Sequence, residues 1–225
     1  MPLVIIMVET FLLVLAALFP VVNPPGTALV FLSLTKRASV AARRELARRV
    51  AINAFFVMAG ALIGGALILK LYGISVPVLR VAGGLIVAAT GWKLLSEGSE
   101  KFEDNQSEQD GRELDYSSQA FYPLTLPLTT GPGTIAVIIS LGLSQGAYSA
   151  HQDYRYLLAG LLAVAVIAAV VYVCFAFSHR VETVLGRGGT DIAVRLTAFI
   201  LFCLGAQIVW SGAADLLGSI VSEAR

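Results

Sequence analysis

Six long stretches of the chain carry no charged residue, and this pattern restricts the possible fold more than any other feature. They cover residues 10–35, 50–69, 81–92, 116–150, 156–178 and 196–214. A helix needs about 20 mostly apolar residues to cross a membrane, and 57% of the 225 residues are hydrophobic while only 14% are charged. We therefore predict an all-α integral membrane protein with six transmembrane helices, in a single membrane domain over residues 1–225.

The charged residues between these stretches predict the orientation of the chain. Short loops rich in Lys and Arg stay in the cytoplasm, whereas acidic residues have little influence. The first loop holds six basic residues: Lys36, Arg37, Arg43, Arg44, Arg48 and Arg49. We expect this loop to be cytoplasmic and, with an even number of spans, both termini to lie outside. The formal net charge of +1 excludes a strongly basic nucleic-acid binder.

A repeated motif divides the chain into two halves. A shift of 107 residues places Pro20 to Leu34 over Pro127 to Leu141, and seven of these 15 positions are identical, where about one is expected by chance. We predict two three-helix repeats, over residues 1–96 and 120–225, joined by an acidic linker over 97–119. Three spans are an odd number, so the second repeat enters the membrane from the opposite side. Such inverted repeats are typical of secondary transporters.

The repeated motif also predicts breaks in the first and fourth spans. Proline ends a helical ladder but suits the first turn of a new helix, and the amides at a helix start attract anions. Non-helical backbone survives at membrane depth only inside protein or beside a wet cavity. We expect the two breaks to face each other and bind a substrate through Asn23, Pro24, Pro25, Gly26, Thr27, Thr130, Gly131, Pro132, Gly133 and Thr134.

These motifs resemble the signatures of the MarC family of six-span inner-membrane proteins, which is related to the LysE-type exporters. The similarity is carried by Asn23 to Gly26 with Phe31 to Thr35, and by Pro123 to Thr134. It implies a transporter of small neutral amino acids such as glycine or alanine, with protons as a candidate coupling ion. This chain departs from the commoner Asn-Pro-Ile-Gly by having Pro25, and its third loop is unusually acidic.

The sequence offers no arrangement expected of an enzyme. The two histidines, His151 and His179, fall in predicted loops, and the two cysteines, Cys174 and Cys203, lie in apolar stretches. We therefore expect no catalytic residue, no metal and no cofactor. The expected partners are a small-molecule substrate and membrane lipid. A channel or a lipid-interacting membrane protein remains the alternative, with an intramembrane enzyme less favoured.

Five polar residues near the spans have roles that the sequence leaves open. Arg80 and Arg195 stand at the heads of spans three and six, where they either anchor the helix at the interface or take part in transport. Glu9 and Asp215 fall near span ends. Gln207, at mid-span, is a candidate for a residue that faces the cavity.

Overall fold

The computed structural model describes residues 3–35, 38–107, 120–121, 124–144 and 154–223. Within these ranges the chain is helical and contains no strand. The helices are α1 (Leu3–Val22), α2 (Pro24–Leu34), α3 (Val40–Tyr72), α4 (Val76–Ser107), η1 (Leu124–Thr129), α6 (Pro132–Ser144), α7 (Tyr154–Ala176) and α8 (Ser178–Glu223). This confirms the predicted all-α class.

Five helical stretches in the described part of the chain are long and apolar enough to cross a membrane. They are Ile5–Leu32, Val40–Tyr72, Val76–Ser96, Tyr154–Ala176 and Ile192–Gly218. The predicted fourth span instead contains a shorter apolar helix, Pro132–Leu143. Leu126, just before it, has extended dihedral angles inside η1. Pro127, Gly131 and Pro132 follow directly, and proline removes the amide that a continuous ladder needs.

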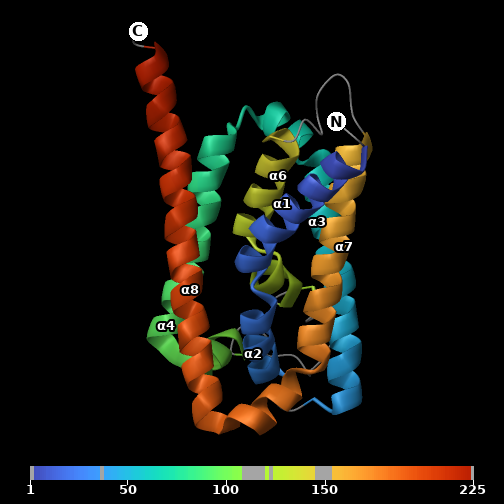
Figure 1. Ribbon diagram of the computed structural model, residues 1–225. Helices are drawn as coiled ribbons and strands as arrows, with labels where there is room; N and C mark the ends of the chain where they lie inside the picture. The colour runs from blue at the N-terminus through green and yellow to red at the C-terminus, as the bar shows by residue number, and fades with distance from the viewer. Residues whose placement is uncertain (1–2, 36–37, 108–119, 122–123, 145–153, 224–225) are drawn as a thin grey trace.

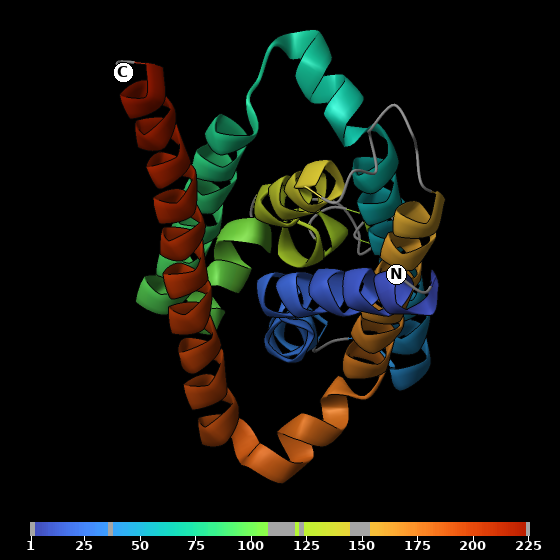
Figure 2. The same ribbon diagram turned by 45° about the horizontal axis from the view of Figure 1, so that its top comes forward.

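Two groups of helices make up the molecule. Figures 1 and 2 show α4 and α8 side by side along one flank, while α1, α3, α6 and α7 gather on the other. The first turn of α1 and the last turn of α8 lie at the same end of the molecule, opposite the α2–α3 connection (Figure 1). A buried apolar core joins α1, α2, α3 and α7, and in it the rings of Phe31 and Phe175 stack with centroids 4.5 Å apart.

Glycines bring α4 and α8 into backbone contact. A Cβ atom at Gly84 would lie 2.7 Å from the backbone nitrogen of Val209, and one at Gly91 would lie 2.5 Å from that of Phe202. From the other side, a Cβ atom at Gly212 would lie 2.7 Å from the carbonyl oxygen of Pro77. Small residues permit such close helix packing in membranes. At each of these points the nearest atom to the added Cβ belongs to the main chain of the opposing helix, so the two backbones approach closely.

Two of the predicted connections are helical instead. α4 continues to Ser107, so residues 97–107 of the predicted acidic linker form its last turns, and the remainder, 108–119, lies outside the described residues. α8 begins at Ser178, and only Phe177 separates it from the end of α7, so the predicted fifth loop with His179 and Arg180 is helical as well. Glu and Lys in the 97–107 stretch are good helix formers, which the prediction from charge alone neglected.

Candidate functional site

The first break is a single residue between α1 and α2. Asn23 has φ 47°, in the left-handed region that few residues other than glycine and asparagine adopt. Its side-chain Oδ1 accepts a hydrogen bond from the Gly26 amide at 3.4 Å, and its carbonyl oxygen accepts one from the Thr27 amide at 2.9 Å. Asn23 is therefore the N-cap of α2.

This cap closes the start of α2 to other acceptors. Pro24 and Pro25 have no amide hydrogen, and Asn23 takes the next two amides, those of Gly26 and Thr27. The Thr27 hydroxyl also donates to the carbonyl of Asn23 at 3.1 Å. The expectation that α2 presents open amides to a substrate is thus not met here, because the side-chain oxygen of Asn23 takes the Gly26 amide and its carbonyl oxygen takes the Thr27 amide.

The second break is longer and leaves its helix start open. Wide turns run through η1, where Leu126 donates its amide to the carbonyl of Phe121 and Thr130 donates to that of Thr125. α6 then begins at Pro132, and glycine at position 131 offers no side chain to cap it. Among the described residues, no protein acceptor is recorded for the amides of Gly133 and Thr134. The positive end of α6 is therefore available to an anion.

A cavity lies between the two breaks. It is lined by six of the ten predicted site residues, namely Asn23, Gly26, Thr27, Gly131, Pro132 and Thr134. The cavity volume that the centre of a water molecule can occupy is about 50 Å³. On the same measure, one water molecule needs roughly 10 to 15 Å³. The cavity therefore has room for a few waters or one small solute.

The other four predicted residues do not line this cavity. Pro24 is buried and Pro25 is exposed at the start of α2. Gly133 is buried against α4, where an added Cβ atom would collide with Cγ2 of Val87. Thr130 is fully buried, and its hydroxyl is one of the few buried side-chain groups in the described region without a hydrogen-bond partner.

Much of the remaining wall comes from α4 and α8, which the sequence analysis did not assign to the site. Ile86, Val87 and Thr90 contribute from α4, and Thr197 and Leu201 from α8. All five sit in apolar stretches whose ordinary interpretation is core or lipid contact. The sequence contains one indication of this wall. Val87, Thr90 and Leu94 follow one another at intervals of three and four residues, which places them on the same face of a helix.

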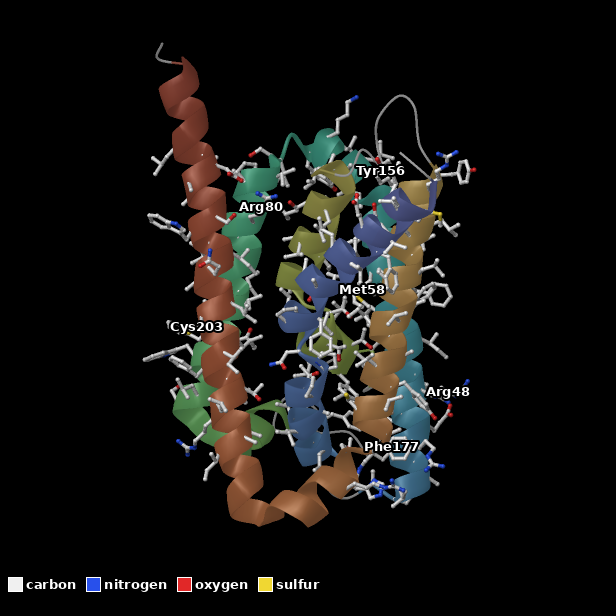
Figure 3. The ribbon with its side chains drawn as sticks, viewed as in Figure 1. Arg48, Met58, Arg80, Tyr156, Phe177 and Cys203 are labelled. Carbon is white, nitrogen blue, oxygen red and sulfur yellow. The ribbon has the colours of Figure 1, made fainter. Side chains whose placement is uncertain are left out.

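Arg80 joins three helices above the cavity. Its Nε donates to Oγ of Ser140 on α6 at 2.9 Å, and its Nη1 lies 2.5 Å from Oδ2 of Asp215 on α8. Figure 3 shows Arg80 toward the end of the molecule where α1 begins. Arg80 is thus more than an interfacial anchor. By contrast, Glu9, Arg195 and Gln207 are exposed, and Gln207 is not in the cavity wall.

At the opposite end, Arg43 secures the far end of α2. The residue is only 8% exposed. Its Nε donates to Oγ1 of Thr35 at 3.1 Å, and its Nη2 donates to the Thr35 carbonyl at 2.8 Å. The Thr35 hydroxyl in turn donates to the carbonyl of Phe31 at 2.7 Å. This arrangement fixes α2, and with it the first break, to the start of α3.

The comparisons with known proteins agree with this membrane architecture. A family model for the MarC family of integral membrane proteins matches residues 8–217. The inner membrane proteins MarC of Escherichia coli O1:K1 and Salmonella typhimurium are each 32% identical to the chain over 206 residues, which are 90% of this chain and 93% of the relative. No solved structure matches the chain. The family match covers nearly the whole sequence, and the chain therefore belongs to the MarC family of integral membrane proteins.

Proposed function

We propose that this protein transports small solutes across the membrane, with small neutral amino acids such as glycine and alanine as substrates. The observation that carries the proposal is one small cavity lined by both break motifs, with the open amides of α6 beside it. A carboxylate suits these amides because the start of a helix carries a partial positive charge. The carboxylate would bind at the start of α6, where Thr134 is in the cavity wall, and not at the capped start of α2.

The rest of the cavity wall favours a small and uncharged side chain. Val30, Val87, Leu128 and Leu201 contribute apolar surface, and no Asp, Glu, Lys or Arg is among the residues of the wall. A charged substrate side chain would lose its hydration there without an ion partner, which is costly. The hydroxyl of Thr134 and the amide of Asn23 are neutral groups that can meet the polar end of an amino acid.

An inverted repeat with alternating access fits the helix pairing. Under the proposed repeat, α3 corresponds to α7 and α4 to α8, and each helix packs against its counterpart. A two-fold axis in the membrane plane relates antiparallel elements, and Figure 1 shows the members of both pairs running in opposite directions. We accordingly assign α1 with α2, and η1 with α6, as the broken first and fourth of six spans, with transport by rocking of one group of helices against the other.

The same scheme gives the orientation of the protein. Arg48 lies at the end of the molecule opposite the start of α1 (Figure 3), and the other basic residues of that helix end are close in sequence. We propose that this end is cytoplasmic and that both termini are outside. Ser39 and Ser75 are exposed at opposite ends of α3. In a variant without Cys174 and Cys203, an impermeant thiol reagent added to intact cells should label Ser75→Cys but not Ser39→Cys, and the reverse pattern would invert the orientation.

Uptake into proteoliposomes tests the function itself. Purified protein should take up labelled glycine and alanine saturably, and an imposed pH gradient should change the rate if protons are the coupling ion. Unsaturable conductance would make the protein a channel, and chemical conversion of the solute would make it an enzyme. No uptake of any amino acid would leave a lipid-interacting role and refute the proposal.

A further inference from the structure

Gly26 and Gly133, the matching glycines of the two break motifs, are each in contact with a side chain from the opposite repeat, and Gly26 also lies against Nδ2 of Asn23. An added Cβ atom at Gly133, in the second repeat, would collide with Cγ2 of Val87 on α4. An added Cβ atom at Gly26, in the first repeat, would collide with Cγ2 of Thr197 on α8 and lie 2.9 Å from its Oγ1. Each contact therefore joins one repeat to the other.

The two covering residues lie on α4 and α8, the third helices of the proposed repeats. A shift of 110 residues, three more than the shift that aligns the break motifs, pairs Val87 with Thr197 and Ala88 with Ala198. The same shift pairs Trp92 with Phe202, whose rings contact each other with centroids 5.9 Å apart. Contact between two equivalent residues is expected where a two-fold axis passes. The covering residues are thus a matched pair built on the α4–α8 seam.

Both side chains also form part of the cavity wall. Val87 is 8% exposed, and it lies directly against Gly133, the neighbour of Thr134 at the start of α6, where we propose that the carboxylate binds. Thr197 is half-buried and lies against Gly26, within the same cavity. A solute held at the start of α6 would therefore extend its side chain into the part of the cavity whose wall Val87 and Thr197 form.

We propose that Val87 and Thr197 set the size limit of the substrate, admitting amino acids whose side chains have at most two heavy atoms, glycine included, and rejecting those of valine and leucine. The inference rests on the proposed transport function and names the residues that make it selective. Replacing either residue with alanine removes the atoms that lie against the glycine and extends the cavity toward it. One methylene in an apolar pocket changes discrimination by roughly 10- to 200-fold.

The two positions differ in one respect that can be tested. Valine and threonine have similar shapes, but the threonine hydroxyl can donate or accept a hydrogen bond. If Thr197 acts by shape, Thr197→Val keeps the size limit while Thr197→Ala relaxes it. The control is Val171→Ala, because Val171 is fully buried in α7, is absent from the cavity wall and loses the same two methyl groups.

The experiment measures inhibition of labelled glycine uptake in proteoliposomes by unlabelled alanine, valine and leucine. We expect Val87→Ala and Thr197→Ala to lower the half-inhibitory concentration of leucine at least tenfold relative to alanine, and Val171→Ala and Thr197→Val to leave this ratio unchanged. If the wild type carries glycine and both alanine variants keep its leucine-to-alanine ratio, the size limit is wrong while the transport function stands. If the wild type carries no amino acid, both are wrong. Should one alanine variant fail to fold, the other decides the result.

Discussion

Removing the Arg43 side chain should be among the more damaging single changes at the end of the molecule where α2 meets α3. The guanidinium is buried and makes two hydrogen bonds to Thr35, at 3.1 and 2.8 Å. Hydrogen bonds to charged groups contribute about 1.5 to 3 kcal/mol each, and part of this is offset because a buried charge no longer has to be desolvated. We expect Arg43→Met to lower the free energy of unfolding by about 2 to 4 kcal/mol.

A double-mutant cycle separates this network from general loss of charge. Thr35→Val deprives the Nε of Arg43 of its acceptor and should cost about 1 to 3 kcal/mol. The double variant should cost at least ~1 kcal/mol less than the sum, because the two residues act on the same hydrogen bonds. Arg44→Met is the matched control, since Arg44 is exposed on the same turn and should change stability by less than about 0.5 kcal/mol.

Denaturant titration in detergent micelles, followed by circular dichroism, measures the free energy of unfolding of the wild type and of each of the four variants. A loss below ~1 kcal/mol for Arg43→Met, or equal losses for Arg43→Met and Arg44→Met, would refute the assignment of Arg43 as the tether of α2. Strict additivity in the cycle would show that Arg43 and Thr35 act independently. Either result would mean that the contact between Arg43 and Thr35 does not hold α2 in place beside the cavity.

Three further predictions concern the cavity and the helices around it. Asn23→Ala should lower the free energy of unfolding by about 1 to 2 kcal/mol and Asn23→Gly by much less, because glycine tolerates the positive φ and is a fair N-cap; equal losses would count against the cap. Arg80→Ala should destabilise the protein more than Asp215→Asn does, since only the arginine also bonds a buried serine hydroxyl, and thermal unfolding in micelles would show the order. Gly133→Val should abolish glycine uptake while the protein still inserts, whereas Gly60→Val, with nothing within 4 Å of its added Cβ, should not; wild-type uptake by the first variant would contradict the packing of α6 on α4.

The sequence was sufficient for the all-α membrane class, and six of the residues that it singled out line the cavity. Those features depend on local chemistry, since uncharged stretches suit a membrane and each proline removes one amide from the helical ladder. The role of Asn23 was less accessible. Its motif predicts an open helix start and an N-cap equally well, and only the backbone geometry shows that its own oxygens take the amides.

The walls supplied by α4 and α8 were not predictable in the same way. Val87 and Thr197 are ordinary residues of apolar helices, and their importance comes from glycines more than 40 residues away in the sequence. The fourth span presents another difficulty. Its uncharged stretch is long enough to cross a membrane, but the chain within it is not one continuous helix. Hydropathy measures how much of a segment prefers lipid, but it does not register where the ladder is interrupted.

The backbone contact between α4 and α8 has a mechanical consequence. Where side chains separate two helices, each helix can shift by letting those side chains change rotamer, but at Gly84 and Gly91 the neighbouring atoms belong to the opposing main chain and have no such freedom. The two helices therefore move together as one rigid unit. This unit contacts the break motifs at two points, through Val87 on α4 and through Thr197 on α8. Any displacement of this rigid unit changes the Val87–Gly133 and Thr197–Gly26 contacts at the same time, so both sides of the cavity would respond to a single movement.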